Sequence, residues 1–185
     1  MARATFFHQM HDIGLAAWFG GTLANAVALN PAAAAGGDPS RAGAVANAGW
    51  DRWTPVNAAA IGVHLIGAAG LLKHDLGRMR AQQGVPTMAA TKTVLTVAAL
   101  GVTAYSRMLG QKVSAHIDVP VTDGTTPTAA TPPDVEAAQK QLTMLQWVVP
   151  ALTGALTAIG AYAAEQYRPE EVSRGVVQRL LPSHN

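Results

Sequence analysis

The sequence predicts an all-α fold: a four-transmembrane-helix bundle with a short interfacial helix before the second span and an amphipathic C-terminal helix. Segments 13–29, 56–72, 94–109 and 142–164 are apolar and almost free of charge, as membrane-spanning helices are. They lack the alternating pattern of barrel strands, and only helices and closed barrels satisfy their backbone polar groups in lipid. Charged residues make up 13% of the 185 residues, against about 25% in soluble domains. The sequence therefore predicts a multi-pass protein of the inner or plasma membrane.

The first two spans have clear boundary signals. The first is expected over residues 5–30, because Pro31 disfavours helical backbone in the residue before it. The second is expected over 55–73, with Thr54 as its N-cap and Pro55 as its first helical residue.

The short interfacial helix is expected between these two spans. Asp38 and Pro39 supply an N-cap and a first-turn proline, and apolar residues then recur at helical spacing. Trp50 and Trp53 lie at its end, where indole rings suit the depth of lipid headgroups.

The second half of the chain contains the other two spans, over 91–110 and 134–167. The fourth helix would reach about 50 Å at 1.5 Å per residue, so one end must project beyond the bilayer. Pro150 is expected to kink it. Residues 111–133 form a Thr- and Pro-rich extramembrane connection, and 169–185 form an interfacial tail.

Charge and composition limit the orientation and the function classes. The two termini and the 73–92 connection carry eight Lys and Arg residues against five in the other two connections, so both termini are expected in the cytoplasm. The net charge of +2 is scattered, which gives no support for nucleic-acid binding. The chain has no cysteine, so disulfides, thiolate ligands and cysteine nucleophiles are excluded.

Polar and small residues recur on one face of each predicted span. The polar ones include Thr22 in the first span, Asn57 in the second, Thr103 in the third and Gln146 in the fourth. Such faces are what any packed membrane bundle places inward, and they do not by themselves indicate a function.

His64 is the one ionisable residue deep inside a predicted span. Intramembrane ionisable residues suggest a functional site. It could be an axial haem ligand, a hydrogen-bond donor to a quinone, or part of a proton relay. The alternative is a neutral, hydrogen-bonded structural histidine.

Two further groups of residues are candidates for binding. His8 and His11 lie three residues apart at the start of the first span and could hold copper or zinc, although no third ligand can be named. The alternative is a solvated helix start. The tryptophans Trp18, Trp50, Trp53 and Trp147 are candidates for contact with partners or lipid headgroups. No catalytic motif is present, so no catalytic residue is predicted.

Two motifs carry a resemblance. The segments His11-Asp-Ile-Gly-Leu-Ala-Ala-Trp-Phe-Gly-Gly21 and Ala48-Gly-Trp-Asp-Arg-Trp-Thr-Pro-Val-Asn57 resemble an uncharacterised family of small actinobacterial membrane proteins. The layout is also similar to the four-helix proteins of the DUF4149/TMEM205 type. In size and character the chain resembles accessory subunits of the cytochrome bcc–aa3 respiratory supercomplex, such as its association factor. The resemblance implies membrane subunits of a respiratory complex as partners, and it brings no catalytic residue.

Together these observations predict a non-catalytic accessory subunit of a larger membrane complex, with a respiratory electron-transfer assembly as the expected host. Its partners would be other integral membrane subunits and lipids, and it would need no cofactor. One alternative is a redox membrane protein that contacts haem or quinone through His64. A small transporter is the other, disfavoured because no charged pathway crosses the spans.

Overall fold

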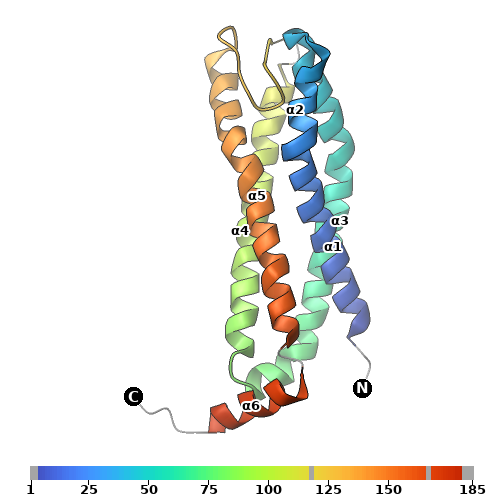
Figure 1. The fold of residues 1–185 in the computed structure, drawn as a ribbon, viewed down its shortest axis with the longest axis vertical. Coiled ribbons are helices and arrows are strands. Elements are labelled where there is room, and N and C mark those ends of the chain that lie inside the picture. The colour runs from blue at the N-terminus through green and yellow to red at the C-terminus, as the bar shows by residue number, and fades with distance from the viewer. Residues whose placement is uncertain (1–3, 117–118, 166–167, 181–185) are drawn as a thin grey trace.

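The computed structural model describes residues 4–116, 119–165 and 168–180, and these form an all-α, four-helix bundle (Figure 1). Four of its helices are long and apolar enough to cross a membrane, which confirms the predicted fold class. An amphipathic sixth helix lies across the end of the bundle where α1 begins. The main helices are α1 (Thr5–Ala24), α3 (Pro39–Ala81), α4 (Val85–Ser114), α5 (Pro133–Glu165) and α6 (Pro169–Leu180).

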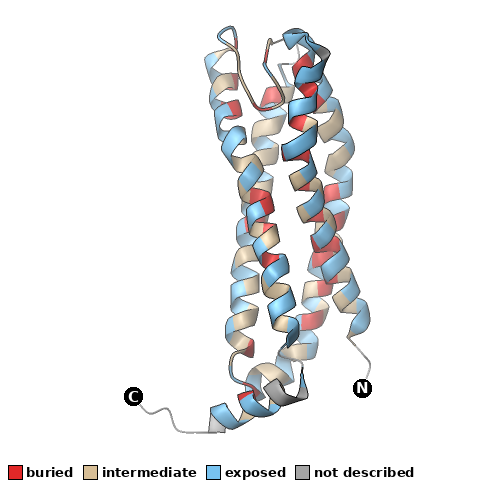
Figure 2. Ribbon diagram, viewed as in Figure 1, coloured by how far each residue is buried: buried red, intermediate tan, exposed pale blue. Residues whose placement is uncertain are grey.

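The bundle consists of two closely packed pairs, α1 with α3 and α4 with α5, which meet mainly along α1 and α5. Buried residues lie on the inward faces of the helices, and most of each helix surface faces outward (Figure 2). The core between the pairs is formed by Leu15, Trp18, Ala99, Val149 and Leu156. Helices α3 and α4 contact each other far less than the helices of either pair. Space therefore remains between α3 and α4.

The sequence predicted that the first span ends at Asn30, but the helical stretch continues beyond this residue. It continues through a π-helical turn, Asn25–Leu29, then through α2 (Asn30–Ala32) and a 3-10 turn, Ala33–Gly36. The backbone N–H of Asn30 donates to the carbonyl of Asn25, five residues back. This wider turn makes room for the ring of Pro31, which needs no N–H partner at the first turn of α2. The stretch ends at Gly37, whose positive φ of 69° suits glycine.

The prediction of a separate interfacial helix before the second span is wrong. Residues 39–81 form one continuous helix with Pro55 inside it. The Thr54 hydroxyl does not cap a new helix; it donates to the carbonyl of Trp50 at 2.8 Å. A threonine that bonds back to the preceding turn and a threonine that caps a helix look alike in sequence, and both are commonly followed by proline.

The remaining segments differ from the prediction mainly in length. Helix α4 begins at Val85, ahead of the predicted 91, and continues to Ser114. Helix α5 spans 133–165 and contains Pro150, while residues 166–167 and 181–185 of the predicted span and tail lie outside the described residues. The non-helical connection after α4 folds over the end of the bundle opposite to α6 (Figure 1).

Candidate functional site

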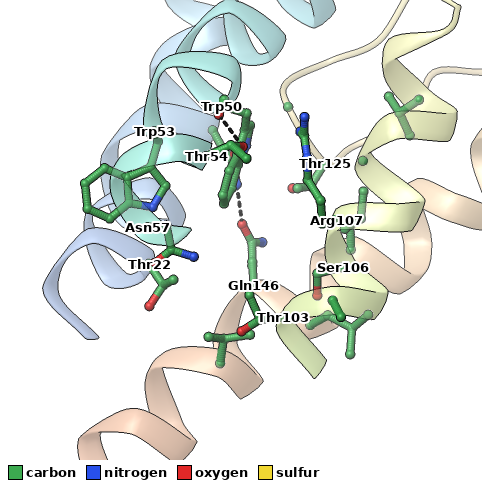
Figure 3. A pocket seen from close by; sticks show the side chains of 18 of the residues that line it. Thr22, Trp50, Trp53, Thr54, Asn57, Thr103, Ser106, Arg107, Thr125 and Gln146 are labelled. Carbon is green, nitrogen blue, oxygen red and sulfur yellow. Dashed lines mark hydrogen bonds between the residues drawn. The ribbon is translucent and has the colours of Figure 1, made fainter. Parts of the chain in front are cut away.

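A cavity of about 330 Å³ lies between α3 and α4 in the half of the bundle nearest the 119–131 connection (Figure 3). Helices α1 and α5 contribute to its walls, and Gly124 and Thr125 of the connection line it too. The cavity exists because small residues, Ala58 on α3 and Ala104 and Gly110 on α4, line its walls. Larger side chains at these positions would fill the space between the two pairs of helices.

At the end of the cavity nearest the 119–131 connection, Asn30 organises a hydrogen-bond network. Its side chain donates to Oε1 of Gln146 at 2.9 Å and accepts from the indole N–H of Trp50 at 3.0 Å. Its backbone carbonyl accepts from the N–H of Gly124 at 3.3 Å. Asn30 is 1% exposed, so this network ties the end of the first helical stretch to α3, α5 and the connection. These groups satisfy one another and need no ligand.

Among the residues that line the cavity, four buried polar atoms have no hydrogen-bond partner within the described part of the chain. They are the indole nitrogen of Trp53, Oδ1 of Asn57 and the hydroxyls of Thr103 and Ser106. A buried polar atom without a partner costs about 1–3 kcal/mol. Threonine in a helix can avoid that cost by bonding back to the preceding turn, as Thr22 does at 2.8 Å to the carbonyl of Trp18. These four atoms belong to cavity-lining residues but are themselves enclosed by neighbouring protein atoms.

Glycine in α1 positions one of these groups. The ring of Trp53 packs directly over Gly21, where any side chain would overlap it. Trp53 and Asn57 are four residues apart on α3 and present one face to the cavity. Thr103 and Ser106 are three residues apart on α4, so the unpartnered atoms come from facing walls (Figure 3).

The cavity contains one charged lining residue among the described residues, Arg107 of α4. Its guanidinium lies 3.5 Å from a carboxylate oxygen of Asp51, whose side chain is largely exposed. The two charges offset each other. The described part of the cavity is therefore close to electrically neutral.

His64 lies outside this cavity, one turn beyond Ile61, which lines it. His64 is fully buried between α1 and α3, and its Nδ1 donates to the backbone carbonyl of His11 at 3.1 Å. The rings of His64 and Trp18 lie 6.1 Å apart, edge to face. The acceptor Nε2 of His64 and the indole N–H of Trp18 both have no partner within the described part of the chain. They are complementary in hydrogen-bonding character.

The two histidines proposed for a metal are not brought together with a third ligand. His11 is 3% exposed and packs against His64, with ring centroids 4.4 Å apart and ring planes inclined by 44°. Its Nδ1 bonds to Asp12 at 2.8 Å. No group of three metal-binding side chains occurs among the described residues, His8 included. The structure thus pairs His11 with His64, a contact that spacing along one helix could not predict.

The four tryptophans occupy three different environments. Trp50 and Trp53 line the cavity, so their indoles point into the bundle. Trp18 is fully buried in the core. Only Trp147, which is 50% exposed on α5, presents a large outward surface to lipid or a partner.

No family model matches the chain, and searches of curated proteins and of solved structures find no match.

Proposed function

We propose that this protein is a non-catalytic membrane protein that binds a lipid-like molecule in the cavity between α3 and α4. The observation that carries the proposal is a cavity of about 330 Å³ with largely apolar walls, in which polar residues such as Asn57, Thr103 and Gln146 also take part. Ligand sites in proteins are typically concave and mostly apolar, with a few polar groups that fix the orientation of the ligand. The volume suits a headgroup and a short length of chain.

The position of the cavity favours a ligand drawn from the membrane. It lies where the apolar segments of α3 and α4 approach the end of the bundle nearest the connection, and these two neighbouring helices contact each other far less than the helices of either pair. Ile61, Leu100 and Val149 supply apolar walls near the polar atoms. An amphiphile could therefore place its polar end inside and leave its chain between the helices.

Filling the cavity tests this proposal. Gly110 lines the cavity and has open space where its Cβ would be, so Gly110→Leu should fit and occupy the ligand volume. Gly101→Leu is the matched control, because Gly101 lies on the same helix with equally open space but does not line the cavity. Native mass spectrometry after gentle detergent extraction should show lipid-mass adducts on wild type and Gly101→Leu but not on Gly110→Leu. Equal adducts on all three proteins would contradict the proposal.

A second proposal is the role expected from sequence, a non-catalytic accessory subunit of a larger membrane complex such as a respiratory assembly. The observation that favours it is the outward surface of the spans. Gly20, Gly62, Gly101 and Gly160 all have open space around them, and small residues let helices of different subunits approach closely in lipid. Exposed Trp147 adds an aromatic contact group. Mass spectrometry of proteins that co-purify in mild detergent tests this; migration as a lone monomer would count against it.

Redox use of His64 has less support from the geometry. The backbones of α1 and α3 touch beside His64, since a Cβ on Gly14 would lie 2.5 Å from the backbone N of His64. A porphyrin beside His64 would require the two helices to separate. The purified protein is therefore expected to lack a Soret band, and a Soret band that disappears in His64→Ala would establish haem binding instead. A quinone could still enter the cavity, where it would meet Trp53 rather than His64.

A further inference from the structure

Resting on the proposed binding function, we infer that the ligand is a zwitterionic phospholipid, whose headgroup carries one phosphate and one ammonium group. The phosphate would bind the guanidinium of Arg107 on α4, and the ammonium group would bind the carboxylate of Asp51 on α3. Three properties of this charge pair support the assignment: its accessibility, its depth in the membrane and its balance of charge.

Arg107 presents accessible hydrogen-bond donors to the cavity. Its side chain lines the cavity, is 34% exposed and extends into the space between α3 and α4 (Figure 3). A guanidinium is a planar fork of N–H donors that matches two oxygens of a phosphate group. Within the described part of the chain its ion-pair contact is with Asp51 at 3.5 Å, longer than the roughly 2.8 Å of a strong charged hydrogen bond. Most of the donors of Arg107 are therefore available to a ligand.

The pair lies at the depth of lipid headgroups. Asp51 comes shortly before the apolar segment 56–72 of α3, and Arg107 lies in the last turn of the apolar segment 94–109 of α4. These ends adjoin because α3 and α4 run in opposite directions (Figure 1), and headgroups lie just outside the hydrocarbon core. Leu100 also lines the cavity, about 10 Å from Arg107 along α4 toward the apolar interior. A phospholipid with its phosphate at Arg107 would therefore place an acyl chain beside Leu100, between the helices.

The balance of charge favours a zwitterion over an anion. Arg107 and Asp51 carry one charge each, and the next pair along α4, Lys112 with Asp134 at 3.7 Å, is balanced as well. An anionic headgroup would place a second negative charge beside Asp51, where the surroundings solvate charge poorly, and would leave one cation for two anions. A zwitterion supplies a partner to each side chain, because its ammonium group can approach the carboxylate of Asp51, which is 65% exposed.

Tryptophan fluorescence measures the selectivity, because Trp50 and Trp53 line the cavity. The full chain with Trp147→Phe, which removes the exposed indole, is delipidated in a non-ionic detergent. It is then titrated at neutral pH with phosphatidylethanolamine brominated on its acyl chains, or with phosphatidylglycerol that carries the same chains. We expect saturable quenching by phosphatidylethanolamine and at least about fivefold weaker binding of the anionic phosphatidylglycerol.

Variants that neutralise one member of the pair give effects of opposite sign. Arg107→Gln should weaken phosphatidylethanolamine binding at least about tenfold, through loss of the charged hydrogen bonds to phosphate. Asp51→Asn should also weaken phosphatidylethanolamine binding, because the ammonium group loses its partner. The same Asp51→Asn change should strengthen phosphatidylglycerol binding, because it removes the repulsion between two anions.

Lys112→Gln is the matched control for the loss of a cation from α4. Lys112 lies on the same helix as Arg107 but is paired with Asp134 and does not line the cavity. This variant should bind both phospholipids as tightly as the protein with Trp147→Phe alone.

Competition tests whether the headgroup belongs to a lipid or to a soluble phosphate ester. Glycerophosphoethanolamine carries the same phosphate and ammonium group without acyl chains. It should relieve quenching only at concentrations at least about a hundredfold above that of the lipid, because it buries no chain. Relief of quenching at equal concentrations would overturn the assignment to a phospholipid.

The remaining outcomes separate this inference from the proposed function. Phosphatidylglycerol binding as tight as phosphatidylethanolamine binding, or unchanged affinity in Arg107→Gln, would overturn the zwitterion assignment and leave the binding function standing if Gly110→Leu abolishes quenching. Absence of saturable quenching by either phospholipid would also overturn the assignment. Equal lipid adducts on wild type and Gly110→Leu in the native mass spectra would then overturn the binding function as well.

Discussion

At the scale of single residues, the contact between α1 and α3 depends on glycines that no other residue could replace without movement. A Cβ on Gly67 would lie 2.7 Å from both the Cα of His11 and the backbone carbonyl oxygen of Phe7. This absence of a side chain lets the two helix backbones touch. It also brings the imidazole of His64 onto the carbonyl of His11.

Gly67→Ala is therefore expected to lower the free energy of unfolding by about 1–3 kcal/mol, because the neighbouring backbone of α1 must shift. Gly62→Ala is the control on the same helix, since its Cβ would meet no atom within 4 Å. That change should leave stability unchanged or raise it by up to about 1 kcal/mol through helix propensity. Thermal unfolding in detergent compares the two. Equal stability of both variants would show that α1 and α3 are not packed backbone to backbone.

At the scale of elements, α3 shows how the start of a helix is fixed locally. Asp38 accepts hydrogen bonds from the backbone N–H of Ser40 at 2.9 Å and from its hydroxyl at 2.6 Å. These bonds favour the carboxylate and lower the pKa of Asp38 below its usual value of 3.8. The sequence predicted this cap correctly, because the bonds span only two residues.

The Asp38 cap gives a pH-dependent prediction. The folded-state pKa is lower than the unfolded one, so the stabilisation is present above about pH 4 and is lost as the pH falls through the folded pKa. Asp38→Ala should lower the melting temperature slightly at neutral pH, and its difference from wild type should vanish in acid. Asp38→Asn keeps an acceptor oxygen without a titrating group, so its difference from wild type should shrink in acid as well, from a smaller value. A difference that stays constant for Asp38→Ala down to pH 2 would rule out the cap as its origin.

The middle of α3 shows where local reasoning fails. Thr54-Pro55 has the pattern of a helix start, yet the helix continues through it. Whether a helix starts at such a dipeptide or continues through it depends on whether the chain on both sides can lie along one axis beside α1. That is settled by packing, not by the dipeptide. The π-helical turn before Pro31 is a second example of this failure. Pro31 predicted the end of the helix, but a wider turn let the helix continue instead.

At the scale of the whole molecule, the cavity results from the way two helix pairs meet. It is bounded by all four long helices and by the connection, so no single element contains it. A cavity lowers stability because its lining atoms lose contacts. A bound molecule restores them and adds stability in proportion to RT ln(1 + [L]/Kd).

Gly110→Leu is therefore expected to raise the melting temperature of the delipidated protein, because leucine fills open space and glycine is a poor helix former. Addition of the lipids that co-purify with the wild type should raise the melting temperature of the delipidated wild type and leave that of Gly110→Leu unchanged. Differential scanning fluorimetry in detergent measures both shifts, with Gly101→Leu as the reference for helix propensity alone. The same ligand-induced rise in Gly110→Leu as in wild type would place the ligand elsewhere.

The sequence by itself determined the four apolar helices, the amphipathic sixth helix and the cap of α3. These follow from composition and from contacts between residues a few positions apart. It also identified polar faces that include Asn57, Thr103 and Gln146, because helical periodicity places such residues on one side. Periodicity cannot say which faces meet.

Only the tertiary structure decided that His11 lies against His64, and that Trp50 and Trp53 point into the bundle rather than toward headgroups. The physical reason is that these contacts depend on the rotation and separation of helices. Glycines at the α1–α3 contact and small residues between α3 and α4 set those quantities jointly. The same small-residue composition closes one interface and opens a cavity in the other.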